Sequence, residues 1–278
     1  MANTTRRNFT KSLIISALAT SFPSTVLQSK QSKAIFQKKA KRLRPNDTVG
    51  IVAPCSKLAA GKLDEAIEKI KNLGLKVKLG NHVSKKNGYL AGTDAQRLDD
   101  VHRMFADPTV SAVWSVRGGY GSSRILPKLD YSLIRKNPKI LIGYSDMTAL
   151  LQAVYKKTGL VGFHGPMGTS TFNDYVVKHF KKIIMNPQPQ LVINYAEANS
   201  NNEDPLFKTH AIRDGIAKGK LMGGNLTLLA ALAGTPYDFN FRNKLVFLED
   251  IGEKPYRIDR MLTQLMQSSN LDEASGIV

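Results

Sequence analysis

The 278-residue sequence has one cysteine, one tryptophan and no apolar run long enough to span a bilayer. A single thiol excludes an intrachain disulfide. Because Cys55 follows an apolar run, we interpret it as a small packing residue and not as a nucleophile. The five histidines are not paired at metal-ligand spacings, so the sequence predicts no metal and no other cofactor. The hydrophobic fraction of 42% and the charged fraction of 22% are typical of a soluble globular protein.

Acidic residues are absent from the first 44 positions, which hold ten lysines and arginines. Ten of the eighteen excess positive charges therefore belong to this segment, and only eight belong to the rest of the chain. That remainder favours acidic small substrates or an anionic envelope surface. No basic helix interleaved with aromatic residues occurs in the sequence, so nucleic-acid binding is not predicted.

The N-terminal segment has the features of an export signal. Arg6 and Arg7 precede a short, weakly apolar run over residues 12–22. A basic region followed by a short apolar region is typical of a signal peptide, and consecutive arginines resemble the bacterial twin-arginine type. We therefore predict a twin-arginine-type signal peptide over residues 1–34 and a periplasmic protein without a transmembrane segment. A disordered basic tail on a cytoplasmic protein is the alternative.

From Pro45 onward, short apolar runs alternate with amphipathic helical patterns. This alternation is typical of a doubly wound, mostly parallel sheet. We predict an α/β fold with such an N-terminal domain and a smaller, β-rich C-terminal domain. The expected strands are residues 48–53, 76–79, 112–116 and 140–142, and the expected helices are residues 61–72 and 94–105.

The distribution of proline and polar residues predicts the domain boundaries. Three prolines and a polar run fall within residues 173–205, which is typical of a connection between domains. Beyond it, we expect strands within residues 211–221, a helix over residues 226–233 and a strand over residues 244–248. The predicted divisions are a signal peptide (1–34), a basic linker (35–46), an N-terminal domain (47–172), an interdomain linker (173–210) and a C-terminal domain (211–278).

Ser145 lies where an apolar strand gives way to a helix, in Gly143-Tyr144-Ser145-Asp146. A sharp turn between a strand and a helix exposes a hydroxyl and aims the first N–H groups of the helix at a substrate oxygen. The turn therefore predicts a serine nucleophile. The alternative is an N-cap serine, since serine is a preferred N-cap and the second glycine of G-x-S-x-G is missing.

The glycine-rich loop Arg117 to Ser123 also follows a strand. It lacks the endings of a P-loop and of a dinucleotide-binding loop, so phosphate binding is weakly supported. A plain turn and an oxyanion loop remain open. Two glycines let a backbone N–H approach a substrate carbonyl without a side chain in the way. Since this loop and Ser145 follow strands of one parallel sheet, we expect them to face one site.

Five motifs, in order, resemble those of the LD-carboxypeptidase family. This family of serine peptidases includes muramoyltetrapeptide carboxypeptidase and the microcin C self-immunity peptidases. The resemblance runs from about Arg44 to the last residue. The motifs are Val49 to Ser56, Arg117 to Gly121, Gly143 to Asp146, Gly223 to Leu226 and Leu248 to Arg260.

The resemblance implies a serine, glutamate and histidine triad that cuts the amide before a terminal D-residue. Carried over by motif, Ser145 is the nucleophile, Glu249 orients the base, and the backbone N–H groups of Gly119 and Asp146 form the oxyanion hole. Asp250 is the alternative to Glu249. A serine hydroxyl needs an imidazole to take its proton, and that imidazole needs a carboxylate to fix its tautomer.

The resemblance also implies residues that bind substrate, namely Arg117, Tyr120, His164 and Asn225. Arg117 either pairs with a substrate carboxylate or braces its loop. His164 either lines the substrate site or is structural. The last motif also contains the charged residues Glu253, Arg257, Asp259 and Arg260. We expect these residues to form a structural network of charges, and a role in binding substrate is the alternative.

The family's histidine base lies downstream of the Glu249 motif, whereas all five histidines of this chain precede Glu249. We expect the chain to be a fragment that stops early in a strand near Val278 and to be badly impaired without its base.

The expected activity is the release of terminal D-alanine from peptidoglycan tetrapeptides, in the recycling or remodelling of muropeptides. Two alternatives are a related hydrolase acting on a peptide–nucleotide or another small acyl-amide, and an inactive module that binds stem peptides. The expected partners are a small peptide or muropeptide and a second copy of the chain in a homodimer.

Overall fold

The computed structural model describes residues 35–194, 196 and 208–278. The signal peptide predicted over residues 1–34 lies outside this range. The described residues contain two separate parallel sheets, one of five strands and one of three. None of the helices in the described range combines the length and the hydrophobicity needed to cross a membrane.

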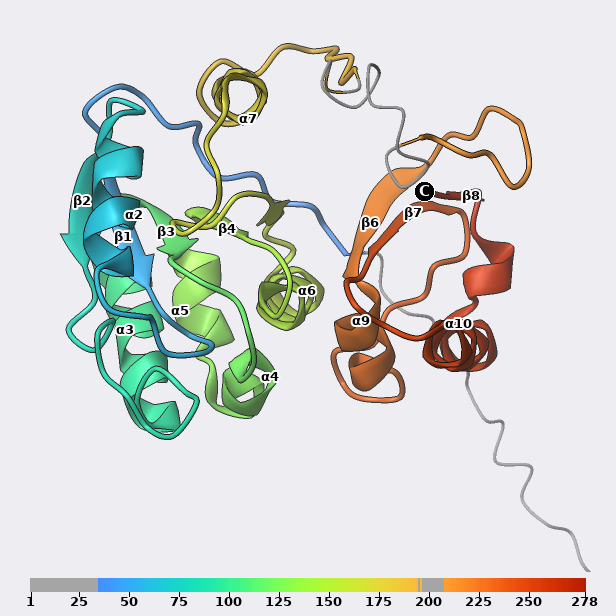
Figure 1. The fold of residues 1–278 in the computed structure, drawn as a ribbon, viewed down its shortest axis with the longest axis horizontal. Helices are drawn as coiled ribbons and strands as arrows, with labels where there is room; N and C mark the ends of the chain where they lie inside the picture. Colours follow the sequence, from blue (N-terminus) through green and yellow to red (C-terminus); the bar gives the residue numbers. More distant parts are fainter. Residues whose placement is uncertain (1–34, 195, 197–207) are drawn as a thin grey trace, which may run out of the picture. The chain divides into compact units, whose positions relative to one another are not determined.

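The larger sheet has the strand order β2-β1-β3-β4-β5, with all neighbours parallel (Figure 1). The chain leaves β1 toward β2 and then returns to add β3, β4 and β5 on the other side. In such sheets the ligand site lies beyond the carboxyl ends of the strands, at this reversal. The strands are β1 (Thr48–Val52), β2 (Lys76–Leu79), β3 (Val110–Ser115), β4 (Ile140–Gly143) and β5 (Phe163–His164).

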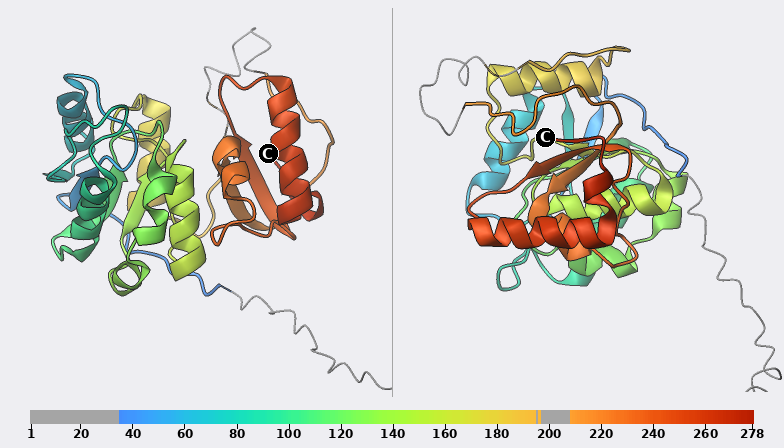
Figure 2. Two further views of the ribbon diagram at one scale, coloured as in Figure 1. Left: turned by 90° about the horizontal axis from the view of Figure 1, so that it is seen from below. Right: turned by 90° about the vertical axis from the view of Figure 1, so that its right-hand side faces the viewer.

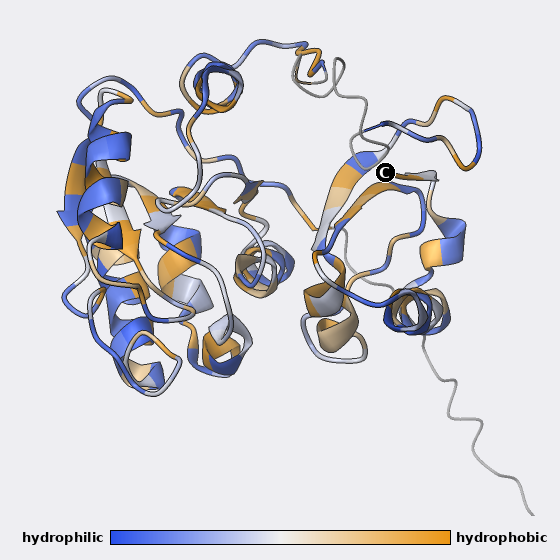
Figure 3. Cartoon of the chain, viewed as in Figure 1, coloured by the Kyte–Doolittle hydropathy of each residue, from blue (hydrophilic) through white to orange (hydrophobic). Residues whose placement is uncertain are grey.

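Helices cover both faces of this sheet (Figure 2), because its strands carry buried apolar side chains on both sides. One face packs against α2 (Lys62–Lys71) and α7 (Asp174–Phe180). The other packs against α3 (Asp94–Ala106), α5 (Tyr131–Lys136) and α6 (Met147–Thr158). Figure 3 shows hydrophilic residues on the outer faces of α2 and α3. The predicted doubly wound α/β fold is therefore confirmed.

Residues 174–185 differ from the expected open linker. They form α7 and a following π turn, η2 (Lys181–Met185). Phe180 stacks on Trp114 of β3, with ring centroids 5.0 Å apart and planes at 15°. Asn173 begins α7, since its side chain accepts a hydrogen bond from the N–H of Val176. This part of the predicted linker therefore belongs to the N-terminal α/β layer.

The smaller sheet has the order β6-β7-β8 and is also parallel. Its apolar side chains form a separate core with helices α9 and α10. The strands expected within residues 211–219 are absent: Ile212 and Ile216 are fully exposed there, and β6 begins only at Lys220. The elements are β6 (Lys220–Asn225), α9 (Leu226–Leu232), β7 (Lys244–Glu249), α10 (Pro255–Ser269) and β8 (Gly276–Ile277).

Short elements complete the chain. Helix α4 (Ser122–Ile125) and the 3₁₀ turn η1 (Leu126–Lys128) connect β3 to α5, and the 3₁₀ turn η4 (Leu271–Glu273) precedes β8.

We predict that Phe180→Ala lowers the free energy of unfolding by about 3–5 kcal/mol, because it removes a buried ring that stacks on Trp114. Urea unfolding followed by far-UV circular dichroism measures this change. Lys178→Ala, on the exposed side of the same helix, is the matched control and should change stability by less than about 0.5 kcal/mol. Equal stability of the two variants would contradict the packed role of α7.

Candidate active site

Ser145 occupies a sharp turn between β4 and α6. Its φ of 59° is in the left-handed region, which is uncommon for a residue with a side chain. Gly143 permits the turn, because a Cβ at this position would lie 2.6 Å from Cγ of Met147. The interpretation of Ser145 as an N-cap is wrong: Asp146 occupies the N-cap position of α6, and no side chain caps that helix end.

Asp146 is completely buried directly after Ser145. Its Oδ2 accepts a hydrogen bond from the N–H of Ser122 at 2.8 Å, and its backbone carbonyl accepts one from Ser122 Oγ at 2.5 Å. Cys55 is also fully buried, and burial together with the neighbouring Asp146 carboxylate raises the pKa of its thiol. A thiol held neutral is a poor nucleophile, which agrees with the predicted packing role of Cys55.

The glycine loop passes directly over Ser145. A Cβ on Gly118 would lie 3.2 Å from Cβ and 3.4 Å from Oγ of Ser145. Gly119 has a φ of 104°, and a Cβ there would lie 2.4 Å from Oγ of Ser56. The carbonyl of Gly118 accepts a hydrogen bond from the N–H of Ser56 at 3.2 Å. Glycine is therefore favoured at Gly119 by its backbone conformation and by the close approach of Ser56, whereas a Cβ on Gly118 would press against the Ser145 side chain.

The N–H groups of Gly119 and Asp146 have no acceptor among the described residues, and the same is true of their neighbours Gly118 and Ser145. The N–H groups that follow in α6 bond to preceding carbonyls. Unsatisfied N–H groups at a strand-to-helix turn suit a developing negative charge on a substrate oxygen.

Arg117 and Tyr120 belong to the same loop but differ in their surroundings. Arg117 Nη1 donates to the carbonyl of Lys57 at 2.6 Å, which braces the loop. Tyr120 is half exposed, and its ring lies 5.7 Å from that of Tyr89. The two exposed rings form an apolar surface beside the glycine loop.

His164 ends β5, next to Gly143 in the strand register. Its ring lies 4.7 Å from that of Phe247, edge to face, and 6.0 Å from that of Tyr144. Burial lowers the pKa of His164 to about 4, so the imidazole is neutral at pH 7. Its Nδ1 is buried and lacks a hydrogen-bond partner within the described residues.

Asn225 and Glu249 are register partners at the ends of β6 and β7. Asn225 Nδ2 donates to Glu249 Oε2 at 3.4 Å, and Asn225 Oδ1 accepts from the N–H of Leu228 at 3.2 Å, which caps α9. Asp250 is already used differently: its Oδ2 accepts from the N–H and the hydroxyl of Thr227 at 2.9 and 2.7 Å. Glu249 is therefore freer than Asp250 to contact another group.

Helix α6 connects this pair to the Ser145 turn. Thr148, three residues after Ser145, accepts a hydrogen bond from the N–H of Asn225 at 3.0 Å. Gln152 Nε2 donates to the carbonyl of Gly223 at 2.5 Å. Gly224 permits this approach, because a Cβ there would lie 2.6 Å from Thr148 Cγ2. Glu249 is thus fixed, through Asn225, to the first turn of the helix that follows Ser145.

None of the five histidines is hydrogen-bonded to Ser145 or Glu249 in the described part of the chain. His82 contacts Asp100 at 3.1 Å, His102 accepts from the N–H of Asp130, and His179 contacts the carbonyl of Tyr175. His164 has only the ring contacts given above, and His210 is exposed.

The charged residues of the last motif lie on or just before α10. Arg257 pairs with Glu253 at 3.4 Å, and the guanidinium of Arg260 lies over the ring of Tyr256. These contacts are local to the helix start.

The sequence predicted no role for four residues that hold the loops in place, directly or through Arg97: Ser56, Asp94, Arg97 and Ser122. Arg97 carried a signal, because it precedes Val101 by four positions and Met104 by seven on the apolar face of its helix. An arginine at such a position has to find buried acceptors. The other three are common loop or helix-end residues without a distinguishing pattern.

We predict that His164 makes stability depend on pH. Its pKa in the folded protein is below the value of about 6.5 in an unfolded chain, so the unfolded state takes up the proton first as the pH falls. The stabilisation is complete above about pH 6.5 and decreases toward pH 4. Urea unfolding at pH 7 and pH 5 should show a loss about 1–2 kcal/mol larger for the wild type than for His164→Phe. A His164 proton resonance that titrates near pH 6.5 would contradict this.

Comparison with known proteins agrees with this geometry. A family model described as the LD-carboxypeptidase N-terminal domain matches residues 49–165, and one described as the LD-carboxypeptidase C-terminal domain matches residues 218–278. The probable murein peptide carboxypeptidase of Bacillus subtilis is 44% identical over 245 residues, which are 86% of this chain and 73% of that protein.

Two solved structures are also similar. The muramoyltetrapeptide carboxypeptidase from Oxalobacter formigenes matches with a TM-score of 0.71 and 31% identity, over 83% of this chain and 75% of that one. An MccF-like protein from Bacillus anthracis matches with a TM-score of 0.74 and 28% identity, over 86% and 79%. As its motifs predicted, the chain belongs to the LD-carboxypeptidase family and is an enzyme of the serine carboxypeptidase type.

Proposed function

We propose that this enzyme releases the terminal D-alanine from tetrapeptide stems of peptidoglycan. The observation that carries the proposal is the left-handed Ser145 turn beneath Gly118 and Gly119, with backbone N–H donors left without acceptors in the described structure. The similarity to proteins named murein peptide and muramoyltetrapeptide carboxypeptidase supports the substrate.

In the proposed reaction, Ser145 Oγ attacks the carbonyl carbon of the scissile amide. The carbonyl oxygen becomes an oxyanion that the N–H groups of Gly119 and Asp146 stabilise. Collapse of the tetrahedral intermediate breaks the C–N bond, and the base that took the Ser145 proton gives it to the leaving nitrogen, which releases the D-amino acid. Water then hydrolyses the ester on Ser145 and restores the hydroxyl.

Glu249 is the carboxylate proposed to orient the base that accepts the Ser145 proton. Asn225, whose backbone N–H is bonded to Thr148 of α6, donates to one oxygen of Glu249 at 3.4 Å and leaves the other oxygen available to the base. The base itself is not assigned to any of the five histidines.

Substrate contacts are proposed for Arg117, Tyr120, His164 and Asn225. Arg117 keeps further N–H donors beyond the one bonded to Lys57, and these suit the terminal carboxylate that a carboxypeptidase has to recognise. The neutral imidazole of His164 and the half-exposed ring of Tyr120 provide apolar surface for the peptide. Asn225 acts mainly by holding Glu249.

Export to the periplasm by a twin-arginine-type signal and assembly into a homodimer complete the proposal. The consecutive arginines and the acid-free first 44 residues support export. The division into an N-terminal domain and a C-terminal domain is supported by the separate matches to residues 49–165 and 218–278.

A second candidate is the hydrolysis of a small acyl-amide such as a peptide–nucleotide. The similarity to an MccF-like protein favours it, because the family resemblance includes peptidases of that type. Parallel assays with a disaccharide tetrapeptide and an aminoacyl sulfamoyl nucleotide distinguish the two substrates.

We predict that Ser145→Ala reduces D-alanine release by at least about 10³-fold, because it removes the nucleophile. Mass spectrometry of a disaccharide tetrapeptide incubated with the full-length protein measures this. Ser170→Ala, a serine whose hydroxyl accepts from the N–H of Met167, is the matched control. D-alanine release that persists in the Ser145→Ala variant would contradict the assignment of Ser145 as the nucleophile.

We predict opposite effects for the two adjacent carboxylates. Glu249→Gln should lower kcat by about 10²-fold or more with little change in stability, since it removes the charge that orients the base. Asp250→Asn should retain activity but lose about 1 kcal/mol of stability, because the start of α9 loses a charged acceptor. Steady-state kinetics and thermal unfolding of both variants test this, and the reverse pattern would make Asp250 the orienting residue.

A further inference from the structure

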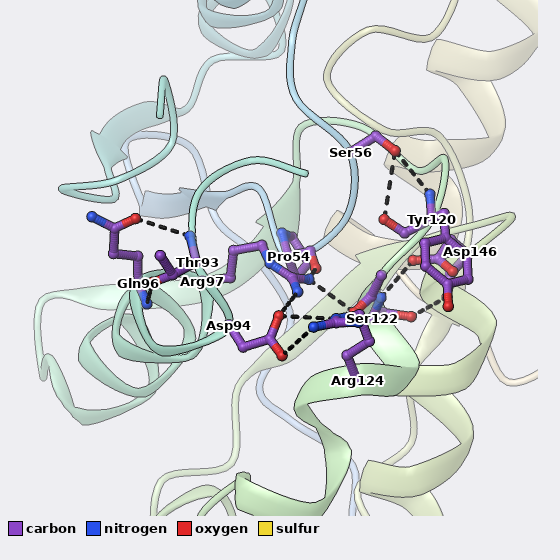
Figure 4. A network of polar contacts seen from close by, with 11 residues as sticks. Pro54, Ser56, Thr93, Asp94, Gln96, Arg97, Tyr120, Ser122, Arg124 and Asp146 are labelled. Carbon is purple, nitrogen blue, oxygen red and sulfur yellow. Dashed lines mark hydrogen bonds and ion pairs between the residues drawn. The ribbon is translucent and has the colours of Figure 1, made fainter. Parts of the chain in front are cut away.

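Arg97 joins two loops of the candidate active site. It lies on α3, and only 1% of its surface is exposed. Its Nη1 donates to the carbonyl of Pro54, which follows β1, and to that of Gly121, in the loop after β3, the latter at 2.8 Å (Figure 4). One buried side chain therefore connects the loops that leave the two strands at the reversal of the sheet.

Asp94 balances the charge of Arg97. Its Oδ1 accepts from Arg97 Nη2 at 2.5 Å, and its two oxygens also accept from Arg124 of α4 at 3.1 and 3.0 Å. Thr93 and Gln96 form a capping box that fixes the first turn of α3 (Figure 4). The guanidinium is thus held in one orientation by a carboxylate that is itself fixed.

Three successive residues of the glycine loop, 120–122, are held in place by hydrogen bonds from or to their backbone. The N–H of Tyr120 donates to Ser56 Oγ at 3.0 Å, the carbonyl of Gly121 accepts from Arg97, and the N–H of Ser122 donates to Asp146. The residue before them, Gly119, has an N–H with no acceptor among the described residues. A rigid loop that keeps one donor free is the arrangement that an oxyanion requires.

Arg97 packs so closely against the glycine loop that no side chain larger than glycine fits at position 121. Gly121 has a φ of 126°, and a Cβ there would lie 2.9 Å from Nη1 of Arg97 and 2.5 Å from Leu90. An apolar side chain in place of Arg97 would fill the volume, but it would leave the carbonyl of Pro54 without a donor and the carbonyl of Gly121 with only the N–H of Arg124 at 3.2 Å. The side chain at position 97 therefore has to donate hydrogen bonds in fixed directions and not only fill the space.

We propose that Arg97 is a positioning residue for the reaction at Ser145: by clamping Gly121 to Pro54, it holds the N–H of Gly119 toward the substrate oxygen. This inference rests on the proposed role of Ser145 as the nucleophile. Arg97 is buried and donates to Pro54, Gly121 and Asp94 and not to Ser145, so its effect is expected on the stabilisation of the transition state and not on substrate affinity.

The test compares Arg97→Lys with the wild type in the full-length protein. Lysine keeps the charge but lacks the planar fork that serves two carbonyls and a carboxylate at once. Arg103→Lys is the matched control, since Arg103 lies on the same helix, is 62% exposed and forms a surface ion pair with Asp99. Three quantities are measured: the rate at which a fluorophosphonate labels Ser145, and kcat and KM for a disaccharide tetrapeptide.

We predict that Arg97→Lys lowers both the labelling rate and kcat by about 10²-fold, while KM changes by less than about twofold. The fluorophosphonate is informative because its tetrahedral adduct places an oxygen where the oxyanion would lie. Arg103→Lys should match the wild type in all three quantities.

Two further measurements keep the test decisive if Arg97→Lys does not fold. Millimolar guanidinium should restore labelling of Arg97→Ala, because it can refill the site and donate to both carbonyls. Ser56→Ala removes only a hydroxyl and should slow labelling about tenfold through the loss of the Tyr120 contact.

Equal labelling of Ser145 in the wild type and in the folded Arg97→Lys variant, or an effect on KM alone, would overturn the inference and leave the nucleophile in place. Absence of labelling in the wild type would overturn the nucleophile and this inference together. Labelling of the wild type therefore distinguishes a wrong role for Arg97 from a wrong role for Ser145.

Discussion

The left-handed backbone of Ser145 is the constraint to which the surrounding structure is adapted. A residue with a side chain held at φ 59° costs of the order of 1–3 kcal/mol, and it persists only where neighbouring contacts over-determine it. Here the neighbours are the buried strand β4 before it and the buried Asp146 after it. The hydrogen bonds between Asp146 and Ser122 fix the start of α6 against α4.

The loops at the carboxyl ends of β1 and β3 carry the other half of the site. Short polar contacts fasten them to one another: Ser56 to Gly118 and Tyr120, and Arg97 to Pro54 and Gly121. In an open parallel sheet these strand ends meet at the reversal of strand order. The glycine loop is therefore held against Ser145 by groups that come from distant parts of the sequence.

The smaller sheet carries Glu249, the carboxylate proposed to orient the base. Gly223 and Gly224 let its backbone approach α6, and Thr148 and Gln152 bond to it there. Asn225 then serves two roles at once, since it caps α9 and donates to Glu249. Changes at Thr148 or Gly224 should therefore disturb Glu249 without touching it.

Most of the strands and helices of the larger sheet followed from apolar periodicity and glycine, because burial on both faces leaves a strong pattern. The Ser145 turn and the glycine loop could also be predicted from the sequence, because each directly follows one of these strongly apolar strands. Helix α7 was missed because prolines just beyond it indicated a linker, whereas its order comes from the stacking of Phe180 on the distant Trp114. The position of Arg97 on the apolar face of its helix indicated a buried contact, but its partners could not be predicted, because two of them are the backbone carbonyls of Pro54 and Gly121, which the sequence does not place.

The most direct test of this account is a crystal structure of the full-length protein with a phosphonate adduct on Ser145. The account predicts that the phosphonyl oxygen lies about 2.7–3.1 Å from both the N–H nitrogen of Gly119 and that of Asp146, with the Arg97 contacts unchanged. An adduct whose oxygen points away from both nitrogens, or a glycine loop that has moved off Ser145, would contradict it.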